Sequence, residues 1–218
     1  MKRLLTILCL VLLSVHSYSQ EVVTEPFLTR DGIPYHQDTN EPVTGIAEQF
    51  YENGQLFERG TYIDGEFDGL RERFHEDGQL SERGNYIDGE LDGLWEVFYE
   101  NGQLRYRGNF IDGELDGLFE EFHEDGQLAQ RGNYIDGEFD GLWETFHDNG
   151  QLEFRSNYID GKENGLGELF FENGQLSERG NYIDGEFDGL WEFFDMYGNL
   201  TETSTFENGE WVETNWNP

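Results

Sequence analysis

The sequence predicts an all-β protein, an elongated antiparallel β-meander built from tandem 24-residue two-stranded hairpin repeats. Three observations lead to this fold class. The fourteen residues "RGNYIDGEFDGLWE" occur at positions 131–144 and again, two periods later, at 179–192. Each period contains two turn dipeptides, and the segments between these turns alternate in polarity and lack proline. A fixed period of this length is typical of linear arrays in which each unit packs on its neighbours.

The period divides the chain into a leader, an array and two caps. Residues 51–194 form six 24-residue repeats, and residues 195–218 form a degenerate repeat that caps the C-terminal end. Residues 20–50 form a lead-in that ends in half a repeat at 44–50 and caps the N-terminal end. The repeats start at Tyr51, His75, Tyr99, His123, His147 and Phe171.

The turn dipeptides predict the local structure of each repeat. One is Asn-Gly or Asp-Gly within "ENGQ" or "EDGQ", and the other is Asp-Gly within "IDGE". Both pairs favour two-residue type I′ turns, which need positive φ at both central positions. No stretch shows sustained helical periodicity. Two strands per repeat at about 4.8 Å spacing predict a ribbon roughly 65 Å long.

Two-residue turns also predict the strand register. They place Glu72 opposite Arg83, so that an acid faces a base. Each exposed pair of this kind contributes only about 0.2–1 kcal/mol, but a slipped register would bring like charges together. The same count gives five further pairs: Glu48–Arg59, Glu96–Arg107, Glu120–Arg131, Glu144–Arg155 and Glu168–Arg179.

The register also assigns the two faces of the sheet. Large rings fall opposite small residues, which protects strand glycines. These pairs are Trp95 with Gly108, Phe119 with Gly132, and Trp143 with Ser156. Parity places Leu56, Gly60, Tyr62, Phe67 and Gly69 on an aromatic face, which we expect to be the main core. The opposite face carries Arg59, Ile63, Leu70, Glu72 and Phe74.

Residues 1–19 have the pattern of a signal peptide. Lys2 and Arg3 precede an apolar run at 4–13, which is too short for a membrane span. Ser17 and Ser19 supply small residues just before a predicted cleavage site. We therefore expect export to the periplasm, the extracellular space or the cell surface. The only cysteine lies in this segment, so the mature chain has no disulfide.

The charge restricts the partners. The chain has 47 acidic against 13 basic residues, a net charge of −34. Such a field repels nucleic acids and anionic membranes, so we expect neither as a partner. We expect an unknown protein or a cell-envelope component, with a basic patch, as the partner.

At this point the repeat resembles a known family. "YENGQLFERGTYIDGEFDGLRERF" and its sister units resemble the MORN-repeat variant of bacterial proteins, often grouped as YwqK-type antitoxin-family proteins. The resemblance covers residues 29–208. It implies an all-β meander that acts as a scaffold or interaction module.

The turn "DGExDG" is the strongest candidate for a ligand site, because alternate acids before glycine resemble the first half of a calcium loop. The second half does not match, since an aromatic residue or histidine stands where the bidentate Glu belongs. A solvated turn is the alternative, so we assign no metal site or cofactor and expect at most weak calcium binding. The metal candidates are Asp64, Glu66, Asp68, Asp88, Glu90, Asp92, Asp136, Glu138, Asp140, Asp184, Glu186 and Asp188.

No arrangement of residues predicts catalysis. The acids recur in every repeat, whereas an active site is normally built once, so we expect no enzyme activity. His75, His123 and His147 stand where other repeats have Tyr or Phe and are interpreted as aromatic substitutes. The fifth repeat departs from the pattern at Ser156 and Gly167, among other positions, either by drift or to shape a contact site.

The sequence therefore predicts an exported, non-enzymatic repeat scaffold for protein–protein or cell-envelope interaction. Two alternatives stay open. One is a protein that responds to calcium through its acidic turns, and the other is an antitoxin-like partner protein, which would require residues 1–19 not to be a signal peptide.

Overall fold

The computed structural model describes residues 22–24, 27–30 and 33–216. The predicted signal peptide lies outside these residues. The described chain consists of strands and turns without a helix, which confirms the all-β fold class. It accordingly has no helix that could cross a membrane.

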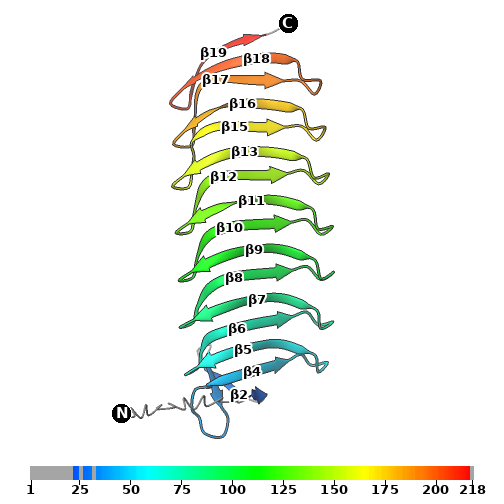
Figure 1. The fold of residues 1–218 in the computed structure, drawn as a ribbon, viewed down its shortest axis with the longest axis vertical. Helices are drawn as coiled ribbons and strands as arrows, with labels where there is room; N and C mark the ends of the chain where they lie inside the picture. The colour runs from blue at the N-terminus through cyan, green and yellow to red at the C-terminus, as the bar shows by residue number, and fades with distance from the viewer. Residues whose placement is uncertain (1–21, 25–26, 31–32, 217–218) are drawn as a thin grey trace, which may run out of the picture.

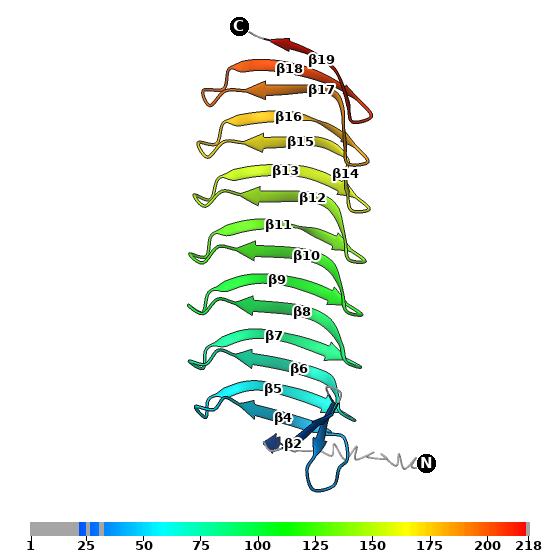
Figure 2. The same cartoon turned by 180° about the vertical axis from the view of Figure 1, so that it is seen from behind.

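One sheet of seventeen strands contains almost the whole described chain, and a separate hairpin, β2–β3, lies at its N-terminal end (Figures 1 and 2). The strands are β1 (Val22–Thr24), β2 (Phe27–Arg30), β3 (Ile33–His36), β4 (Gly45–Phe50), β5 (Leu56–Ile63), β6 (Glu66–Phe74), β7 (Leu80–Ile87), β8 (Glu90–Phe98), β9 (Leu104–Ile111), β10 (Glu114–Phe122), β11 (Leu128–Ile135), β12 (Glu138–Phe146), β13 (Leu152–Ile159), β14 (Lys162–Glu163), β15 (Gly165–Phe170), β16 (Leu176–Ile183), β17 (Glu186–Phe194), β18 (Leu200–Glu207) and β19 (Glu210–Trp216).

From β4 to β19 each strand pairs antiparallel with the next, which confirms the meander. The strands stack along the long axis of the molecule in a single layer (Figure 1). β14 and β15 both pair with β13 and are two pieces of one interrupted strand. The exception to the antiparallel order is β1, which pairs parallel with β4 and covers that edge of the sheet.

The "IDGE" turns have the predicted type I′ signature. In the first repeat, Asp64 has φ of 50° and Gly65 has φ of 88°, and every later repeat has the same pair of positive angles. Glycine adopts this conformation without penalty and Asp tolerates it better than most residues, which explains the dipeptide. The tight turn pairs Ile63 with Glu66 directly after it.

The prediction of two-residue turns at "ENGQ" and "EDGQ" is wrong. His75 N–H bonds to the Gln79 carbonyl, and Gly78 N–H bonds back to the His75 carbonyl, so three residues form the loop. Gly78 has positive φ, but the preceding Asp does not. This is the three-residue hairpin loop that ends in a left-handed glycine.

The predicted register nevertheless holds, because a second irregularity compensates the first. The pairing shifts by one residue between Phe74↔Leu80 and Arg73↔Glu82, which leaves an extra residue as a β-bulge. Beyond the bulge, Glu72 lies opposite Arg83 as predicted. The other five predicted pairs are also confirmed: Glu48–Arg59, Glu96–Arg107, Glu120–Arg131, Glu144–Arg155 and Glu168–Arg179.

The glycine of each "DGL" segment lies at a further irregularity. On β6 the register shifts between Tyr62↔Phe67 and Gly60↔Arg71, and Gly69 in this segment has φ of 115°. Because the shift is two residues, it leaves the side-chain parity unchanged, and Gly60, Tyr62, Phe67 and Gly69 lie on the predicted face. The equivalents of Gly69 in the later repeats also have positive φ. The one-residue bulge does change the parity. Leu56 pairs with Phe50 on the loop side of the bulge, so it lies on the face opposite the aromatic one, and its predicted place on the aromatic face is wrong.

The aromatic face is the better buried one, as predicted. Its rows of rings run from hairpin to hairpin, with Tyr134 4.7 Å from Phe139 and Phe139 5.3 Å from Tyr158 between centroids. Trp143 and Trp191, also on this face, are 7% and 2% exposed. In the first repeat, Thr29 of β2 and Pro34 of β3 line one hollow with Tyr62 and Phe67, so the small hairpin covers part of this face. In the later described repeats, burial comes from neighbouring hairpins of the same sheet.

The strand glycines are covered by rings, but from a different neighbour than expected. Phe119 lies opposite Gly132 as predicted. A Cβ at Gly132 would, however, overlap the Trp143 ring, which comes from the following strand. Gly180 and Trp191 have the same relation.

The two kinds of glycine give a testable contrast. Gly132→Ala should lower the free energy of unfolding by about 1–3 kcal/mol through overpacking against Trp143. Gly141→Ala should cost about 1–2 kcal/mol through backbone strain, because its φ is 79° and the space around it is open. Urea unfolding measures both. Adding Trp143→Leu should make Gly132→Ala milder and leave the cost of Gly141→Ala unchanged; equal changes would contradict the assignment.

Candidate interaction surfaces

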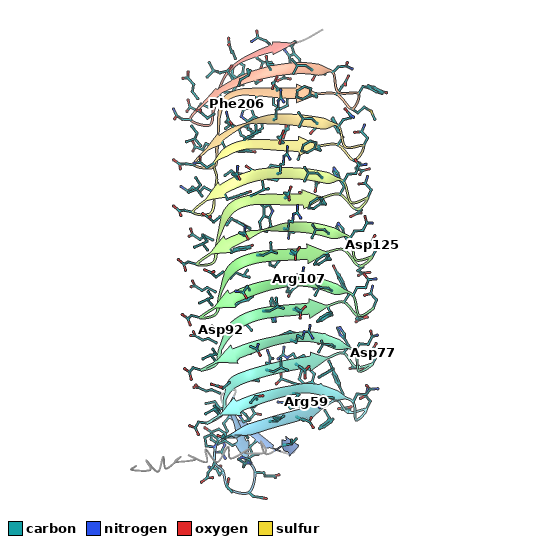
Figure 3. All side chains as sticks on the ribbon, viewed as in Figure 1. Arg59, Asp77, Asp92, Arg107, Asp125 and Phe206 are labelled. Atoms are coloured by element: carbon teal, nitrogen blue, oxygen red, sulfur yellow. The ribbon has the colours of Figure 1, made fainter. Side chains whose placement is uncertain are left out.

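A continuous row of alternating charges crosses the middle of the face opposite the aromatic one. Each arginine of the row has a Glu directly opposite on both neighbouring strands; Arg83, for example, pairs with Glu72 and with Glu96. We call this the Arg–Glu row. Figure 3 shows two of its members, Arg59 and Arg107, near the middle of their strands. The row contains Glu48, Arg59, Glu72, Arg83, Glu96, Arg107, Glu120, Arg131, Glu144, Arg155, Glu168, Arg179 and Glu192.

The side chains choose one of their two possible partners. Arg107 contacts Glu120 at 2.6 Å and Arg131 contacts Glu144 at 2.6 Å, each on the following strand. The register predicted from the turns had paired these two arginines with Glu96 and Glu120 on the preceding strands instead. Arg59 differs, because it binds Glu48 on the preceding strand at 2.7 Å. Each arginine after it also lies over a Phe ring, as Arg131 does over Phe146 at 5.8 Å.

The candidate calcium ligands lie along one long edge of the sheet. Asp64 is in the turn, Glu66 begins β6, and Asp68 lies two residues further on the same strand. Among the described residues, no three His, Cys, Asp or Glu side chains form a group that could hold a metal ion.

The two long edges carry acids without basic partners. The ion pairs of the described chain involve the Arg–Glu row, one cluster in the first two repeats and two histidine contacts, but not the acids of the "IDGE" turns. Figure 3 shows Asp92 at one edge and Asp77 and Asp125 at the other. The negative field is therefore strongest along the edges.

The histidines occupy the aromatic slot of the second turn. The Tyr51 hydroxyl donates a hydrogen bond to the Phe74 carbonyl, at the end of the neighbouring hairpin, at 2.8 Å. His147 makes the equivalent contact through Nε2 to the Phe170 carbonyl, also at 2.8 Å. At position 147 the substitution of His for Tyr thus keeps a bond between neighbouring hairpins, whereas Nε2 of His123 has no hydrogen-bond partner among the described residues.

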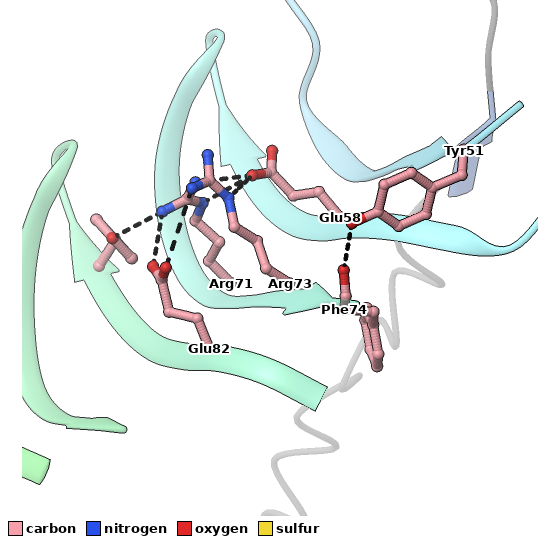
Figure 4. A network of polar contacts seen from close by, with 7 residues as sticks. Tyr51, Glu58, Arg71, Arg73, Phe74 and Glu82 are labelled. Carbon is pink, nitrogen blue, oxygen red and sulfur yellow. Dashed lines mark hydrogen bonds and ion pairs between the residues drawn. The ribbon is translucent and has the colours of Figure 1, made fainter. Parts of the chain in front are cut away.

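A buried charge cluster in the first two repeats was missed by the sequence analysis. Glu58 is 6% exposed and accepts bonds from Arg71 at 2.7 Å and from Arg73 at 2.8 Å (Figure 4). Arg71 also contacts Glu82 at 3.2 Å and lies over the Phe67 ring at 4.9 Å. The sequence does contain an indication of this cluster. Arg71 occupies the position at which all later repeats except the fifth have Trp or Phe.

The cluster perturbs the groups around it. Burial raises the pKa of Tyr62, and the Glu58 carboxylate adds to this effect. Burial alone would lower the pKa of Arg71, but the contacts with Glu58 and Tyr86 outweigh it, so the pKa is raised. The cluster is a network on the aromatic face in which Arg71 and Arg73 are paired with Glu58 and Glu82.

The fifth repeat replaces two rings of the aromatic face. Gly167 stands in the Trp position, and a Cβ there would meet the Tyr182 ring, which has moved into the space. Glu163 stands in the Phe position and accepts a bond from the Tyr158 hydroxyl at 3.2 Å. Burial, together with nearby carboxylates, raises the pKa of Tyr182 to about 12. The strand is also interrupted here, at Asn164.

These features define a class of protein, a single-layer array of β-hairpin repeats. The family model described as MORN repeat variant matches residues 43–64, 67–88, 91–112, 115–136, 139–160 and 163–184, more than half of the chain. The chain belongs to the MORN repeat variant family. Each matched segment is one hairpin around an "ENGQ"-type turn, and it ends in the Asp of the following "IDGE" turn.

Comparison with curated protein sequences gave no match. Solved structures with local similarity include a crystal structure of TarM, at 17% identity over 44% of this chain and 19% of that chain, with a TM-score of 0.29. Another is the GtfA/B complex bound to UDP and GlcNAc, at 11% identity over 51% and 22%, with a TM-score of 0.23. A third is a mutant of S. aureus TarM, at 15% identity over 55% of this chain and 21% of that chain, with a TM-score of 0.26. The chain spans about a fifth of each of these proteins.

The buried cluster predicts the outcome of restoring the repeat pattern. Arg71→Trp should lower the free energy of unfolding by about 1–3 kcal/mol, because the buried Glu58 loses Arg71, the more buried of its two arginine partners. Adding Glu58→Gln should recover most of this loss. Thermal or urea unfolding measures both variants. A single Arg71→Trp variant that is more stable than the parent would contradict the assignment.

Proposed function

We propose that this chain is an exported, non-enzymatic scaffold that holds a basic protein or cell-envelope partner along its acidic edges. The observation that carries the proposal is the distribution of charge. The arginines of the Arg–Glu row pair within the sheet, while the acids of the "IDGE" turns have no basic partner among the described residues. At the other edge, Asp148 contacts His123. The net charge of −34 is therefore displayed to the surroundings.

The shape of the array supports the same role. A stack of near-identical hairpins offers a long surface on which the same contact recurs at every repeat. A partner that touches several repeats gains affinity from several weak charge contacts, and the field speeds its approach. Such binding weakens as salt is added, because exposed charges are screened over about 8–10 Å.

The proposal of export depends on the sequence pattern of residues 1–19. The proposal that the chain has no enzyme activity depends on the repetition of its acidic residues. The acids recur at the same place in every hairpin, whereas catalysis needs one group whose environment differs from that of its copies. The basic residues that could neutralise the field are few, so we place the complementary charge on the partner. An antitoxin-like role for a cytoplasmic partner is the alternative if residues 1–19 are retained.

The proposal is tested in producing cells by cross-linking and N-terminal sequencing. We expect a chain that begins near Gln20 in the envelope or outside the cell, cross-linked to a partner with a basic surface. Neutralising four edge acids, Glu90→Gln, Glu114→Gln, Glu138→Gln and Glu186→Gln, should reduce the cross-link yield several-fold.

A matched set removes the same charge from the opposite edge through Glu76→Gln, Glu100→Gln, Glu124→Gln and Glu172→Gln, and comparison of the two yields shows which edge holds the partner. If neither set changes the yield, the acidic edges do not bind the partner. A chain that retains Met1 in the cytoplasm overturns the export part and favours the antitoxin-like alternative.

Calcium response is tested by a thermal melt of residues 20–218 at physiological salt. Because the described residues contain no group of three acids or histidines that could hold an ion, we expect millimolar calcium and magnesium to raise the midpoint equally and slightly, by screening. A large rise with calcium alone would show that the turns coordinate it and would replace the scaffold proposal with the calcium-responsive one.

A further inference from the structure

A stripe of half-exposed aliphatic side chains runs the length of the face that carries the Arg–Glu row. The Ile of each "IDG" turn is 50–54% exposed and the Leu of each "DGL" segment is 44–56% exposed. We call these residues the aliphatic stripe. They are Ile63, Leu70, Ile87, Leu94, Ile111, Leu118, Ile135, Leu142, Ile159, Leu166, Ile183 and Leu190.

The register brings the stripe residues together in Leu–Ile pairs, which Asn and Glu positions on the intervening strands separate. Leu118 lies opposite Asn133, so that Ile135, two residues further on, is its diagonal neighbour. Diagonal neighbours are about 7–8 Å apart and within reach of long side chains. The same relation joins Leu142 to Ile159. Soluble proteins rarely expose a contiguous apolar patch of more than a few hundred Å², and larger patches mark interaction sites.

The borders of the stripe specify the charge of its partner. Along the turn side, every Ile of the stripe except Ile159 lies directly opposite a Glu, as Ile135 does opposite Glu138, so acids alternate with the Ile side chains. On the other side lies the Arg–Glu row, whose charges are already paired. A complementary surface therefore needs Lys or Arg along one flank of its apolar side chains. A second copy of this chain has the wrong charge, because it would bring two acidic edges together.

The spacing of the stripe specifies the form of the partner. Successive hairpins repeat every two strands, which is about 9.6 Å. Residues seven apart in an α-helix repeat every 10.5 Å, close enough to stay in step over about three hairpins. An extended strand of the partner does not match, because its same-side residues repeat at about 6.7 Å. Helices commonly dock through one apolar face in this way.

We propose that the aliphatic stripe is the docking surface for an amphipathic helix whose apolar residues recur every seven positions and whose acid-facing flank carries Lys or Arg. This inference rests on the proposed function, whose partner it specifies further. The fifth repeat interrupts the acidic border, because Lys162 replaces Glu opposite Ile159. The second to fourth repeats, where the border is unbroken, are therefore the preferred site.

The test uses two synthetic helical peptides of three heptads, one with leucines flanked by lysines and one with leucines flanked by glutamates. Binding to the mature protein is measured by fluorescence anisotropy at 150 mM salt. We expect the Leu/Lys peptide alone to bind. The double variant Leu118→Asn, Leu142→Asn, which leaves the charge unchanged, should weaken this binding at least tenfold.

The matched control is Ala129→Asn, a position at which other repeats already have Ser81, Arg105 and Glu153. Its binding should equal that of the parent, and circular dichroism melts should show all three proteins folded. Equal binding by the parent and the Leu118/Leu142 variant would mean that the contact is only electrostatic, which overturns this inference and leaves the proposed function standing.

Carbene footprinting in the producing cell supplies an independent readout. Leu118 and Leu142 should be labelled in the purified protein and protected in the fraction where the protein resides. Equal labelling in both overturns the docking surface. Protection that rises with the concentration of the purified protein alone would identify a second copy as the occupant and would also overturn it.

Discussion

The structure depends on one constraint, which is that a single-layer sheet has no other layer against which to bury its side chains. Each hairpin must find its apolar contacts in the next hairpin, one strand spacing away. The aromatic face meets this need with rows of rings, in which Phe67 lies 5.2 Å from Tyr86 and Phe139 lies 5.3 Å from Tyr158. Because every contact is with a neighbour, copying one hairpin extends the fold without a new core.

The same constraint governs the charges on the opposite face. A row of like charges at strand spacing would oppose stacking. Successive strands therefore contribute Glu and Arg to the row in turn. The row stabilises the array modestly, since its arginines are about half exposed and such pairs contribute little individually. Its larger effect is on specificity, because a slip of one residue would expose the aromatic face and misalign the row. The acids that have no place in the row lie at the turns, where they repel one another least.

The individuality of the protein lies where the repeat pattern fails. In the first repeat, Arg71 replaces a ring and pairs with a buried Glu58, and in the fifth, Tyr182 fills the space left by Gly167. Both changes keep the aromatic face filled. The aliphatic stripe, in contrast, changes little along the array. It remains half exposed although nothing in the hairpin geometry requires Ile and Leu there, which is why a partner is the simplest physical account of it.

The sequence by itself determined the fold class, the period, the register of the charged pairs and the identity of the two faces. These follow from local rules, since turn dipeptides, side-chain parity and a fixed period act within one hairpin. Only the tertiary structure decided how the turns and bulges combine, which neighbour each side chain prefers, and how much of each face stays exposed. A three-residue loop and a compensating bulge give the same register as the simpler turn, so the pattern of pairs cannot distinguish them. Arg131 has a Glu on both sides, and only the packing over Phe146 on the following strand selects Glu144.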